Sequence, residues 1–453
     1  MPHTPSKGAV SAGVEEQTRV IAKVSRRLIP VLFLMYIINY LDRINIGFAA
    51  LSMNKDLGLS ATAFGFSATI FYIGYVACEL PSNLLMVRFG ARVWLARILV
   101  SWGIASSATM LVFDTRSLYL VRFLVGVMEA GFVPGVLLYL SYWFPASYRA
   151  RANALLMMAQ PVAMAVGAGV SGLILQNAHG MLRIQGWRWL FLFEGIPAVP
   201  LGILAYFYLS DRPEQGKWLT RNEADTVNQM LAEDKPAPRA SHGASVWKQL
   251  ADKNIVMLSV GYFCLVNTIN VNATWIPTIV RGVLQNRSFS YIGTVSALPA
   301  VFALILMPLL GSSSDRRKER CWHTVAALAL AAIGWQLVLF GHHAELRLLG
   351  LMFTTSGAFS AMSIFWTLPQ TLLSEKARPA GIAVISSVGL MGSATSPTVI
   401  GFLRDLTGNF GAGLFYSTVL LVISMVLIIA VTKRKAAVLP KISLAAVRSL
   451  WVL

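Results

Sequence analysis

The sequence predicts an all-α membrane protein with twelve membrane-spanning helices in two halves of six. Hydrophobic residues make up 56% of the 453 residues and charged residues only 13%, whereas soluble globular chains are about one quarter charged. Twelve apolar stretches approach the ~20 residues that a helix needs to cross ~30 Å of hydrocarbon. Most of the surface is therefore expected to face lipid, and we expect a multi-pass protein of the cell inner (plasma) membrane.

Charged and Gly/Pro-rich breaks set the limits of the expected spans. The only long polar segment lies between the sixth and seventh spans, and it divides the chain into an N-terminal tail (1–27), an N-terminal half (28–209), a central loop (210–253), a C-terminal half (254–432) and a C-terminal tail (433–453). The twelve spans are 28–51, 62–86, 93–112, 117–142, 152–176, 188–209, 254–279, 289–311, 322–341, 346–369, 379–402 and 410–432.

The distribution of Lys and Arg gives the orientation, because cytoplasmic loops of membrane proteins are rich in both. With the N-terminus inside, 28 of the 38 basic residues fall in inner segments and 8 in outer loops, and Arg43 and Arg122 lie within spans. Both termini are therefore expected in the cytoplasm. The net charge of +18 follows mainly from topology, so we expect a lipid bilayer and no nucleic acid as a partner.

Several local patterns refine this picture. The first 27 residues lack an apolar core followed by a small-residue cleavage site, so the first span is expected to act as its own insertion signal. In the central loop, Thr220 followed by Glu223 predicts the start of a short surface helix. Gly131 and Pro134 predict a bend in the fourth span. "GAGVSG" at 167–172 lies inside a span without a preceding strand, so we interpret it as helix packing.

Ionisable residues inside spans are concentrated in the first half. Each costs ~2.5–3.5 kcal/mol on insertion scales, and such residues therefore need partners or a wet cavity. The second half has none well inside a span. Those of the first half are Asp42, Arg43, Glu79, Arg122, Glu129 and Glu194.

The stretch "NYLDRINIG" at 39–47 places Tyr, Asn, Asp and Arg on overlapping faces of the first span. In the fourth span Arg122 and Glu129 lie two turns apart on the same side. These groups form either structural ion pairs or a site for an organic anion coupled to protons, since Arg grips carboxylates and a buried acid can load and release a proton. Asp42 and Arg43 point about 100° apart, so we expect their partners to be Arg122 and Glu129.

Two basic turns recur at corresponding places in the two halves, as a parallel repeat predicts. "GSSSDRRKER" at 311–320 carries Gly311, Asp315 and Arg316 in a Gly-x-x-x-Asp-Arg pattern, and "VRFGARVW" at 87–94 is its counterpart, with Val87 in the acid position. Together with the two halves and the central loop, this pattern resembles the major facilitator superfamily. The resemblance implies the major facilitator fold and a structural latch at these turns.

Four stretches, "NYLDRINI", "RFLVGVMEAGFVPG", "YRARANAL" and "GWRWLFLFEGIPA", resemble the anion:cation symporter family of bacterial organic-acid permeases. "LDRINIGFA" and "GAFSAMSIFWT" are similar to members that carry 4-hydroxyphenylacetate; other members carry galactonate, glucarate, tartrate or phthalate. The resemblance implies that Arg43 and Arg122 handle substrate charge and that Asp42 and Glu129 carry the proton. It also implies that Tyr40, Tyr75 and Gln160 line the cavity. Glu79 and Glu194 are interpreted as structural.

The second half is expected to supply the rest of the cavity. Asn267 in the seventh span, and Ser363 and Trp366 in the tenth, would form a polar and aromatic wall opposite the arginines. An aryl acid would then place its carboxylate on the arginines and its ring against Trp366 or Trp275. Helix–helix packing explains each of these residues about equally well.

The resulting hypothesis is proton-coupled import of an aromatic organic acid anion, such as 4-hydroxyphenylacetate, by alternating access. The alternative is proton-coupled symport of a sugar acid or dicarboxylate (galactonate, glucarate, tartrate) or of a phthalate-like anion. We expect a monomer, a small organic anion and a proton as partners, and no cofactor or metal. An enzyme is not expected, because the sequence shows no catalytic His, paired-acid loop or metal-ligand spacing, and the central loop is too short for a signalling domain.

Overall fold

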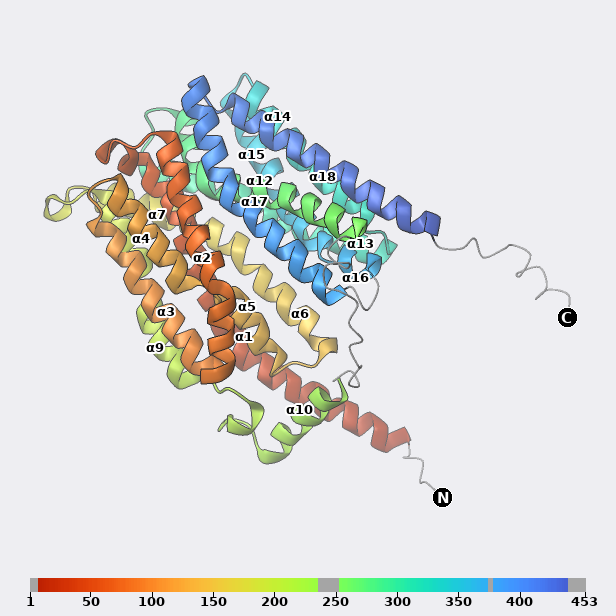
Figure 1. Cartoon of the computed structure of the whole chain (residues 1–453). Coiled ribbons are helices and arrows are strands. Elements are labelled where there is room, and N and C mark those ends of the chain that lie inside the picture. Colours follow the sequence, from red (N-terminus) through yellow and green to blue (C-terminus); the bar gives the residue numbers. More distant parts are fainter. Residues whose placement is uncertain (1–6, 235–251, 374–377, 439–453) are drawn as a thin grey trace, which may run out of the picture.

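The computed structural model describes residues 7–234, 252–373 and 378–438. Within these ranges the regular structure consists of helices alone. The helices form two groups that follow the order of the chain, with the N-terminal half drawn in red to yellow and the C-terminal half in green to blue (Figure 1). The expected all-α architecture in two six-span halves is confirmed.

The N-terminal half contains one long helix that extends beyond the bundle and five further spans, four of which consist of two consecutive helices. Its spans are formed by α1 (Lys7–Asp56), α2 (Ala61–Phe89), α3 with η1 (Ala91–Ser107, Ala108–Leu111), α4 with α5 (Thr115–Glu129, Phe132–Ser141), α6 with α7 (Ala146–Met157, Ala159–Asn177) and α8 with α9 (Gly186–Gly195, Ala198–Tyr208).

In the described part of the C-terminal half, every span except the tenth of the chain is a single helix. Its spans are α12 (Lys253–Leu284), α13 (Phe289–Arg317), α14 (Cys321–Phe340), α15 with α16 (Ala344–Phe365, Leu368–Leu372), α17 (Arg378–Thr407) and α18 (Gly411–Val438). Two short helices, η2 (Met181–Arg183) and η3 (Pro213–Gln215), lie in loops, and α10 (Arg221–Glu233) lies in the central loop.

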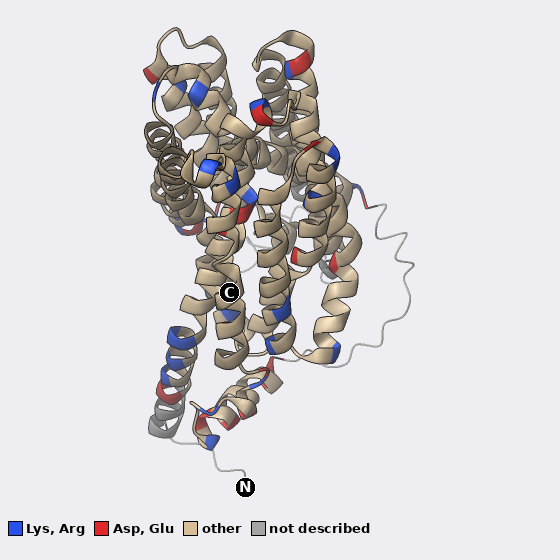
Figure 2. Cartoon of the chain, turned by 90° about the vertical axis from the view of Figure 1, so that its left-hand side faces the viewer, with Lys and Arg blue, Asp and Glu red and all other residues tan. Residues whose placement is uncertain are grey.

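Eleven helical stretches of the described chain are long and apolar enough to cross a membrane. Helix α1, the twelfth span, is not among these eleven, but its residues from Leu28 onward include many buried apolar side chains. It packs within the bundle against α7, α8 and α12. Figure 2 shows that most of the ribbon carries no charged residue, as a lipid-facing surface requires.

The break in the fourth span lies directly after Glu129. Ala130 leaves the helix with ψ 133°, and Gly131 has φ +85°, a left-handed conformation that side chains with a Cβ disfavour. A Cβ at Gly131 would lie 2.4 Å from the hydroxyl oxygen of Ser82. That hydroxyl donates to the Ala130 carbonyl at 2.6 Å, which satisfies a backbone group freed by the break. The bend predicted from Gly131 and Pro134 is confirmed.

The cytoplasmic extension of α1 packs on the central-loop helix α10. Val20 and Val24 of α1 are fully buried in one apolar cluster with Val227 of α10. The Lys23 ammonium lies 2.7 Å from a Glu223 carboxylate oxygen. Helix α1 begins at Lys7, within the segment expected as a tail. Around Val20 and Val24, α10 covers an apolar face of this extension. The predicted start of α10 is confirmed by a capping box between Thr220 and Glu223.

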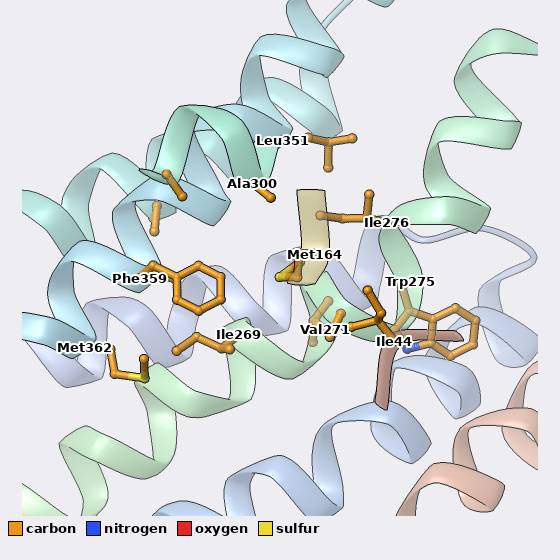
Figure 3. Packing of buried hydrophobic residues seen from close by; sticks show 14 of the residues in the cluster. Ile44, Met164, Ile269, Val271, Trp275, Ile276, Ala300, Leu351, Phe359 and Met362 are labelled. Atoms are coloured by element: carbon orange, nitrogen blue, oxygen red, sulfur yellow. The ribbon is translucent and has the colours of Figure 1, made fainter. Parts of the chain in front are cut away.

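Buried apolar side chains form two clusters. One cluster holds the interior of the N-terminal half together with α10. The other joins the C-terminal half to α1, α2, α4, α7 and α8 of the N-terminal half. Figure 3 shows Ile44 and Met164 gathered with side chains of α12, α13 and α15. The apolar core is thus continuous between the halves at the level of Ile44 and Met164.

The halves meet at the helix ends that the charge distribution assigns to the outer side. A Cβ at Gly65 of α2 would lie 2.1 Å from the Pro397 carbonyl oxygen of α17, and one at Gly172 of α7 would lie 2.9 Å from the Gly293 Cα of α13. The Asp405 carboxylate accepts hydrogen bonds from the Ala61 and Thr62 backbone N–H groups at 3.0 and 2.7 Å.

These contacts close the outer side of the bundle. The three pairs of helices with extensive contacts between the halves are α2 with α17, α7 with α13 and α1 with α12. All the close glycine contacts across them fall at the outer ends, so the structure has the arrangement of a transporter closed to the outside. The "GAGVSG" stretch lies in the α7 crossing, and its interpretation as helix packing is confirmed.

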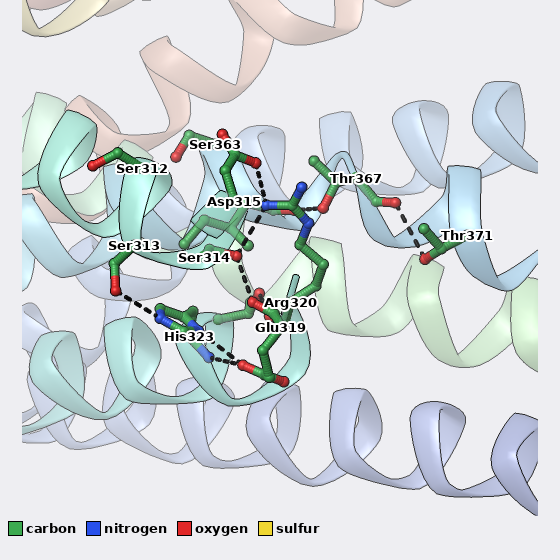
Figure 4. A network of polar contacts seen from close by, with 12 residues as sticks. Ser312, Ser313, Ser314, Asp315, Glu319, Arg320, His323, Ser363, Thr367 and Thr371 are labelled. Atoms are coloured by element: carbon green, nitrogen blue, oxygen red, sulfur yellow. Dashed lines mark hydrogen bonds and ion pairs between the residues drawn. The ribbon is translucent and has the colours of Figure 1, made fainter. Parts of the chain in front are cut away.

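The turn between α13 and α14 holds a polar network (Figure 4). Arg320 Nη1 lies 2.5 Å from Asp315 Oδ1. The Glu319 carboxylate accepts from the Trp322 backbone N–H at 2.8 Å and contacts the His323 ring nitrogen Nδ1 at 2.8 Å. Backbone and imidazole contacts outweigh the burial of this carboxyl and lower the pKa of Glu319. The network ties the end of one span to the start of the next.

The corresponding turn of the N-terminal half uses a different acid. Val87 occupies the acid position, and Asp211, just after α9, supplies the carboxylate instead by accepting from the Arg92 backbone N–H at 2.7 Å. A Cβ at Gly90 would lie 2.7 Å from the same carboxylate. The turn is therefore attached to the end of the sixth span.

Candidate functional site

The Phe71 ring of α2 lies close to both Arg43 and Arg122, the two arginines inside spans of the N-terminal half. The guanidinium carbon of Arg43 is 5.5 Å from the ring centroid, and that of Arg122 is 5.1 Å from the same centroid. Cations at such distances are attracted to the electron-rich ring face. Two residues almost eighty positions apart thus place permanent positive charge in one part of the bundle.

Arg43 is paired with Glu129. Its Nε donates to Glu129 Oε1 at 2.7 Å, and its Nη2 lies 2.6 Å from the same oxygen. The Glu129 side chain is completely buried, and Arg43 is 17% exposed. The second carboxylate oxygen, Oε2, is buried without a hydrogen-bond partner in the described part of the chain. This pair agrees with the expectation that Arg43 reaches across to the fourth span.

Arg122 is 2% exposed, and its environment differs from that of Arg43. Its Nε and Nη1 are buried without a hydrogen-bond partner among the described residues, although the guanidinium always carries a charge. A buried cation with unmet donors is costly unless an anion completes its surroundings. Arg122 is therefore a candidate anion-binding residue.

Asp42 is held by neutral donors, which differs from the expectation that it pairs with Arg122. Its carboxylate accepts from Trp102 Nε1 at 2.8 Å, from Asn45 Nδ2 at 3.0 Å and from the Ser106 hydroxyl. Trp102 and Ser106 lie one turn apart on α3, so this helix turns both donors toward α1. Asp42 and Arg43 point in different directions around the α1 axis. The partners of Asp42 on another helix are therefore the α3 donors Trp102 and Ser106, where Arg122 was expected.

The three residues expected to line the cavity from the N-terminal half lie in different surroundings. Tyr75 is buried with its ring centroid 5.0 Å from the Arg43 guanidinium carbon. Gln160 donates to the Tyr36 hydroxyl at 2.9 Å, which connects α7 to α1. Tyr40 is 8% exposed and packs in the apolar cluster that joins the halves. Tyr75 is thus the one placed directly beside the charged pair.

The residues expected from the C-terminal half are spread along the bundle. Asn267 is fully buried, and neither its amide oxygen nor its amide nitrogen has a partner among the described residues. Ser363 donates to its own helix at Ser360 O, 2.8 Å away. Trp366 stacks edge-on against Tyr262 at 4.9 Å. Trp275 is sealed between the Phe64 and Phe410 rings at 5.1 and 5.4 Å, so its ring faces are already occupied.

The structure adds residues that the sequence analysis did not select. Phe71 is the ring shared by the two arginines, and Trp102 with Ser106 holds Asp42. Tyr72 donates to the Asn270 side chain across the halves at 2.5 Å. Trp102 and Ser106 have helical i, i+4 spacing, which marks a common face. Nothing in the sequence indicates which span that face meets.

These features define the class of the protein: a helical membrane transporter with two halves, a sealed outer side and charged groups inside one half. A family model described as "Major Facilitator Superfamily" matches residues 32–397. The chain belongs to this superfamily.

Two relatives and one solved structure agree with this assignment. The chain is 41% identical over 418 residues to a protein of Agrobacterium vitis described as "Putative tartrate transporter", with 92% of this chain and 95% of that one covered. A second protein of that organism with the same description is 42% identical over 412 residues and 91% of each chain. The solved structure is that of a bacterial homologue of the human lysosomal transporter Spinster in an inward-facing, unoccupied conformation. The match has a TM-score of 0.72 at 17% sequence identity and covers 92% of this chain and 97% of that one. At this identity, the similarity shows the fold alone.

The comparisons favour the alternative expectation, which already included tartrate, over an aromatic acid. The two relatives described above have tartrate in their names, and the finer resemblance to permeases for 4-hydroxyphenylacetate is not supported by them. The protein is thus a transporter of the major facilitator superfamily, and not an enzyme.

Proposed function

We propose that this protein is a proton-coupled symporter of a small hydroxylated dicarboxylate, with tartrate as the reference substrate. The observation that carries the proposal is the buried Arg122 guanidinium, whose Nε and Nη1 have no partner in the described chain. A carboxylate bound there would accept two charge-assisted hydrogen bonds and remove the cost of a buried unpaired cation.

The charge of a dicarboxylate suits the arrangement around Phe71. Arg122 supplies one cation without an acid partner, and Arg43 supplies a second cation that Glu129 already holds. A dianion would bind Arg122 with one carboxylate and compete with Glu129 for Arg43 with the other. The two relatives with tartrate in their descriptions support this choice of substrate class.

The same competition provides a coupling step. Glu129 keeps its charge in a buried place because Arg43 neutralises it. When a substrate carboxylate takes Arg43, Glu129 loses its counter-ion and becomes stable only with a proton, for which its Oε2 is available. Substrate and proton would therefore occupy the site together.

We also propose that the protein works as a monomer in the bacterial inner membrane.

An aromatic monocarboxylate is the second candidate. Tyr262, Phe365 and Trp366 form an aromatic cluster in the C-terminal half, with the Tyr262 ring centroid 5.0 Å from Phe365 and 4.9 Å from Trp366. Trp366 is half-buried, so its ring has area left for a flat ligand. This cluster supports 4-hydroxyphenylacetate, whereas the pair of arginines supports a dianion.

The test is a thermal-unfolding panel on the purified full chain in detergent, with tartrate, galactonate, phthalate and 4-hydroxyphenylacetate. A ligand that binds the folded state alone raises the unfolding temperature in proportion to its occupancy. We expect tartrate to give the largest shift, and uptake of labelled tartrate into proteoliposomes to increase when the outside is acidified. A shift with 4-hydroxyphenylacetate alone would favour the second candidate, and uptake indifferent to the pH gradient would exclude symport with protons.

A further inference from the structure

Glu194 is a buried carboxyl that the proposed coupling step does not use. It lies in the last turn of α8, directly before the break at Ile196 and Pro197, and is 4% exposed. The Ser171 hydroxyl of α7 donates to its Oε1 at 2.6 Å. Its Oε2 is buried without a hydrogen-bond partner in the described ranges.

No basic side chain of the described chain lies within ion-pair distance of Glu194. Helices α1, α3, α7, α9 and η1 pack against α8, and α7 and η1 contain no titratable residue. Arg188, on α8 itself, is near the outer end and lies 4.0 Å from Asp56. The other titratable groups in the part of α1 from Leu28 onward are Tyr36, Tyr40, Asp42, Arg43, which is held by Glu129, and Lys55 at the outer end. Toward the inner side lie Arg92, Arg97, Tyr206 and Tyr208, together with the charged residues of the α1 extension before Leu28.

Asp42 is the titratable group that faces the same region as Glu194. It reaches α3 at Trp102 and Ser106. Gly195, the neighbour of Glu194, packs on the adjacent residues of α3, where its Cβ would lie 2.7 Å from the Ser107 hydroxyl oxygen. The nearest charge is therefore another acid. A carboxyl with one hydrogen bond, no cation and a second acid nearby is stable only when it carries a proton.

Ser171, the hydrogen-bond partner of Glu194, lies next to the crossing of α7 and α13 that closes the outer side. Ser171 immediately precedes Gly172, whose Cβ would lie 2.7 Å from the Phe289 carbonyl oxygen and 2.9 Å from the Gly293 Cα of α13. This crossing of α7 and α13 must separate when the transporter opens outward. Its separation would bring water to the Ser171 side of the carboxyl, which is sealed in the present structure.

We propose that Glu194 is a second proton-carrying residue of the transport cycle, loaded from the outer side when the α7–α13 crossing opens and occluded in the state described here. The inference rests on the proposed proton coupling and deepens it. One proton from the outer solution binds a carboxylate oxygen of Glu194, and the same proton is released on the inner side, so that no other bond is made or broken.

The experiment measures the number of protons per tartrate in proteoliposomes. With the membrane potential clamped to zero and the tartrate gradient fixed, the pH gradient that stops net tartrate flux gives this ratio, including the case in which two protons make transport of a dianion electroneutral. We expect Glu194→Gln, which mimics the protonated form, to lower the ratio by one, and Glu194→Asp to retain it. Glu345→Gln, at an exposed outer position, is the matched control and is expected to keep the wild-type ratio.

Two results separate the two proposals. If wild-type flux ignores the pH gradient, the symport proposal itself fails, and Glu194 has no proton cycle to serve. If the wild type is coupled and Glu194→Gln shows the same ratio, Glu194 is a structural acid and the present inference is overturned while symport stands.

A second variant covers the case in which Glu194→Gln does not fold. Ser171→Ala removes the hydrogen bond that supports the ionised carboxylate. Proton release then becomes harder, and we expect the pH profile of tartrate uptake to move to higher pH with unchanged tartrate binding. An unshifted profile in a folded Ser171→Ala protein would contradict a proton-carrying role, because a merely structural hydrogen bond would not couple to pH.

Discussion

Arg43 and Glu129, on the first and fourth spans, form an ion pair in which two guanidinium nitrogens lie 2.7 and 2.6 Å from one carboxylate oxygen. The pair sits at the point where the fourth span is interrupted, because α4 ends at Glu129. Breaking a buried pair by removing one partner leaves an uncompensated charge. A substrate carboxylate that binds Arg43 would therefore leave the charge of Glu129 without its counter-ion, which is the basis of the proposed coupling.

Replacing Arg122 with Ala should remove most tartrate affinity. Loss of one partner of a buried charge-assisted pair costs about 2–5 kcal/mol, which corresponds to at least about a 30-fold rise in the dissociation constant. Isothermal titration of the purified variant measures this change. The control is Arg116→Ala, an exposed arginine in the first turn of the same helix α4. Unchanged affinity in Arg122→Ala would refute its role as the carboxylate receptor.

Replacing Glu129 with Gln should separate exchange from coupling. Glutamine keeps the size of the side chain but cannot gain or lose a proton, so counterflow exchange of tartrate should persist while uptake driven by a pH gradient falls, because one proton fewer is carried per tartrate. Both are measured in proteoliposomes with labelled tartrate. Gradient-driven uptake at the wild-type rate would place the coupling proton elsewhere, and Glu345→Gln controls for a change in net charge.

Adding a methyl group at Gly172 should impair closure of the outer side. Its Cβ would lie 2.7 Å from the Phe289 carbonyl oxygen, so the α7–α13 crossing must widen, whereas a Cβ at Gly169 on the same helix meets nothing within 4 Å. We expect Gly172→Ala to slow uptake several-fold and Gly169→Ala to leave it unchanged. Equal rates in the two variants would show that the crossing has room to adjust.

Acid should weaken the contact between α1 and α10. The hydrogen bond from Lys23, followed by that from the Thr220 backbone N–H, holds the pKa of Glu223 below its usual range. The contribution of Glu223 to stability is therefore full above the ordinary carboxyl pKa of about 4.3 and is lost as the pH falls through the lowered value.

The size of this effect is limited because both side chains reach solvent. Exposed ion pairs contribute about 1 kcal/mol or less, so Glu223→Gln should increase the rate of proteolysis within α10 modestly at pH 7. The difference from the wild type should shrink as the pH falls through the lowered pKa of Glu223, because Glu223 of the wild type is then protonated as well. A rate difference that persists in acid would assign the effect to something other than charge.

Periodicity and charge were enough to predict the helical elements. The apolar runs, the bias of Lys and Arg and the Thr220–Glu223 cap act over a few residues each, and the structure confirms the spans and the start of α10. The break near Gly131 could also be predicted, since a positive φ and a nearby proline are local properties of the chain. The sequence likewise indicated which ionisable residues lie inside spans.

The partners of those residues depended on the tertiary structure. A helical face can be read from spacing, but which span it meets is fixed by packing between residues far apart in the chain. Asp42 thus contacts Trp102 and Ser106 of α3 instead of Arg122, and Phe71, an ordinary apolar residue in the sequence, joins the two arginines. Glu194 is interpreted as structural from its sequence context, and only the packing shows that one of its oxygens is buried without a hydrogen-bond partner among the described residues.

The sequence by itself determined the number, direction and charge of the spans, because hydrophobicity and the position of basic residues act locally. Only the tertiary structure decided which side of the bundle is closed and which acids have a cation, because both depend on close approach between helices from different parts of the chain. The glycine crossings at Gly65 and Gly172 bring the halves together at the outer end. Of the buried acids, Glu129 lies beside an arginine and Glu194 does not.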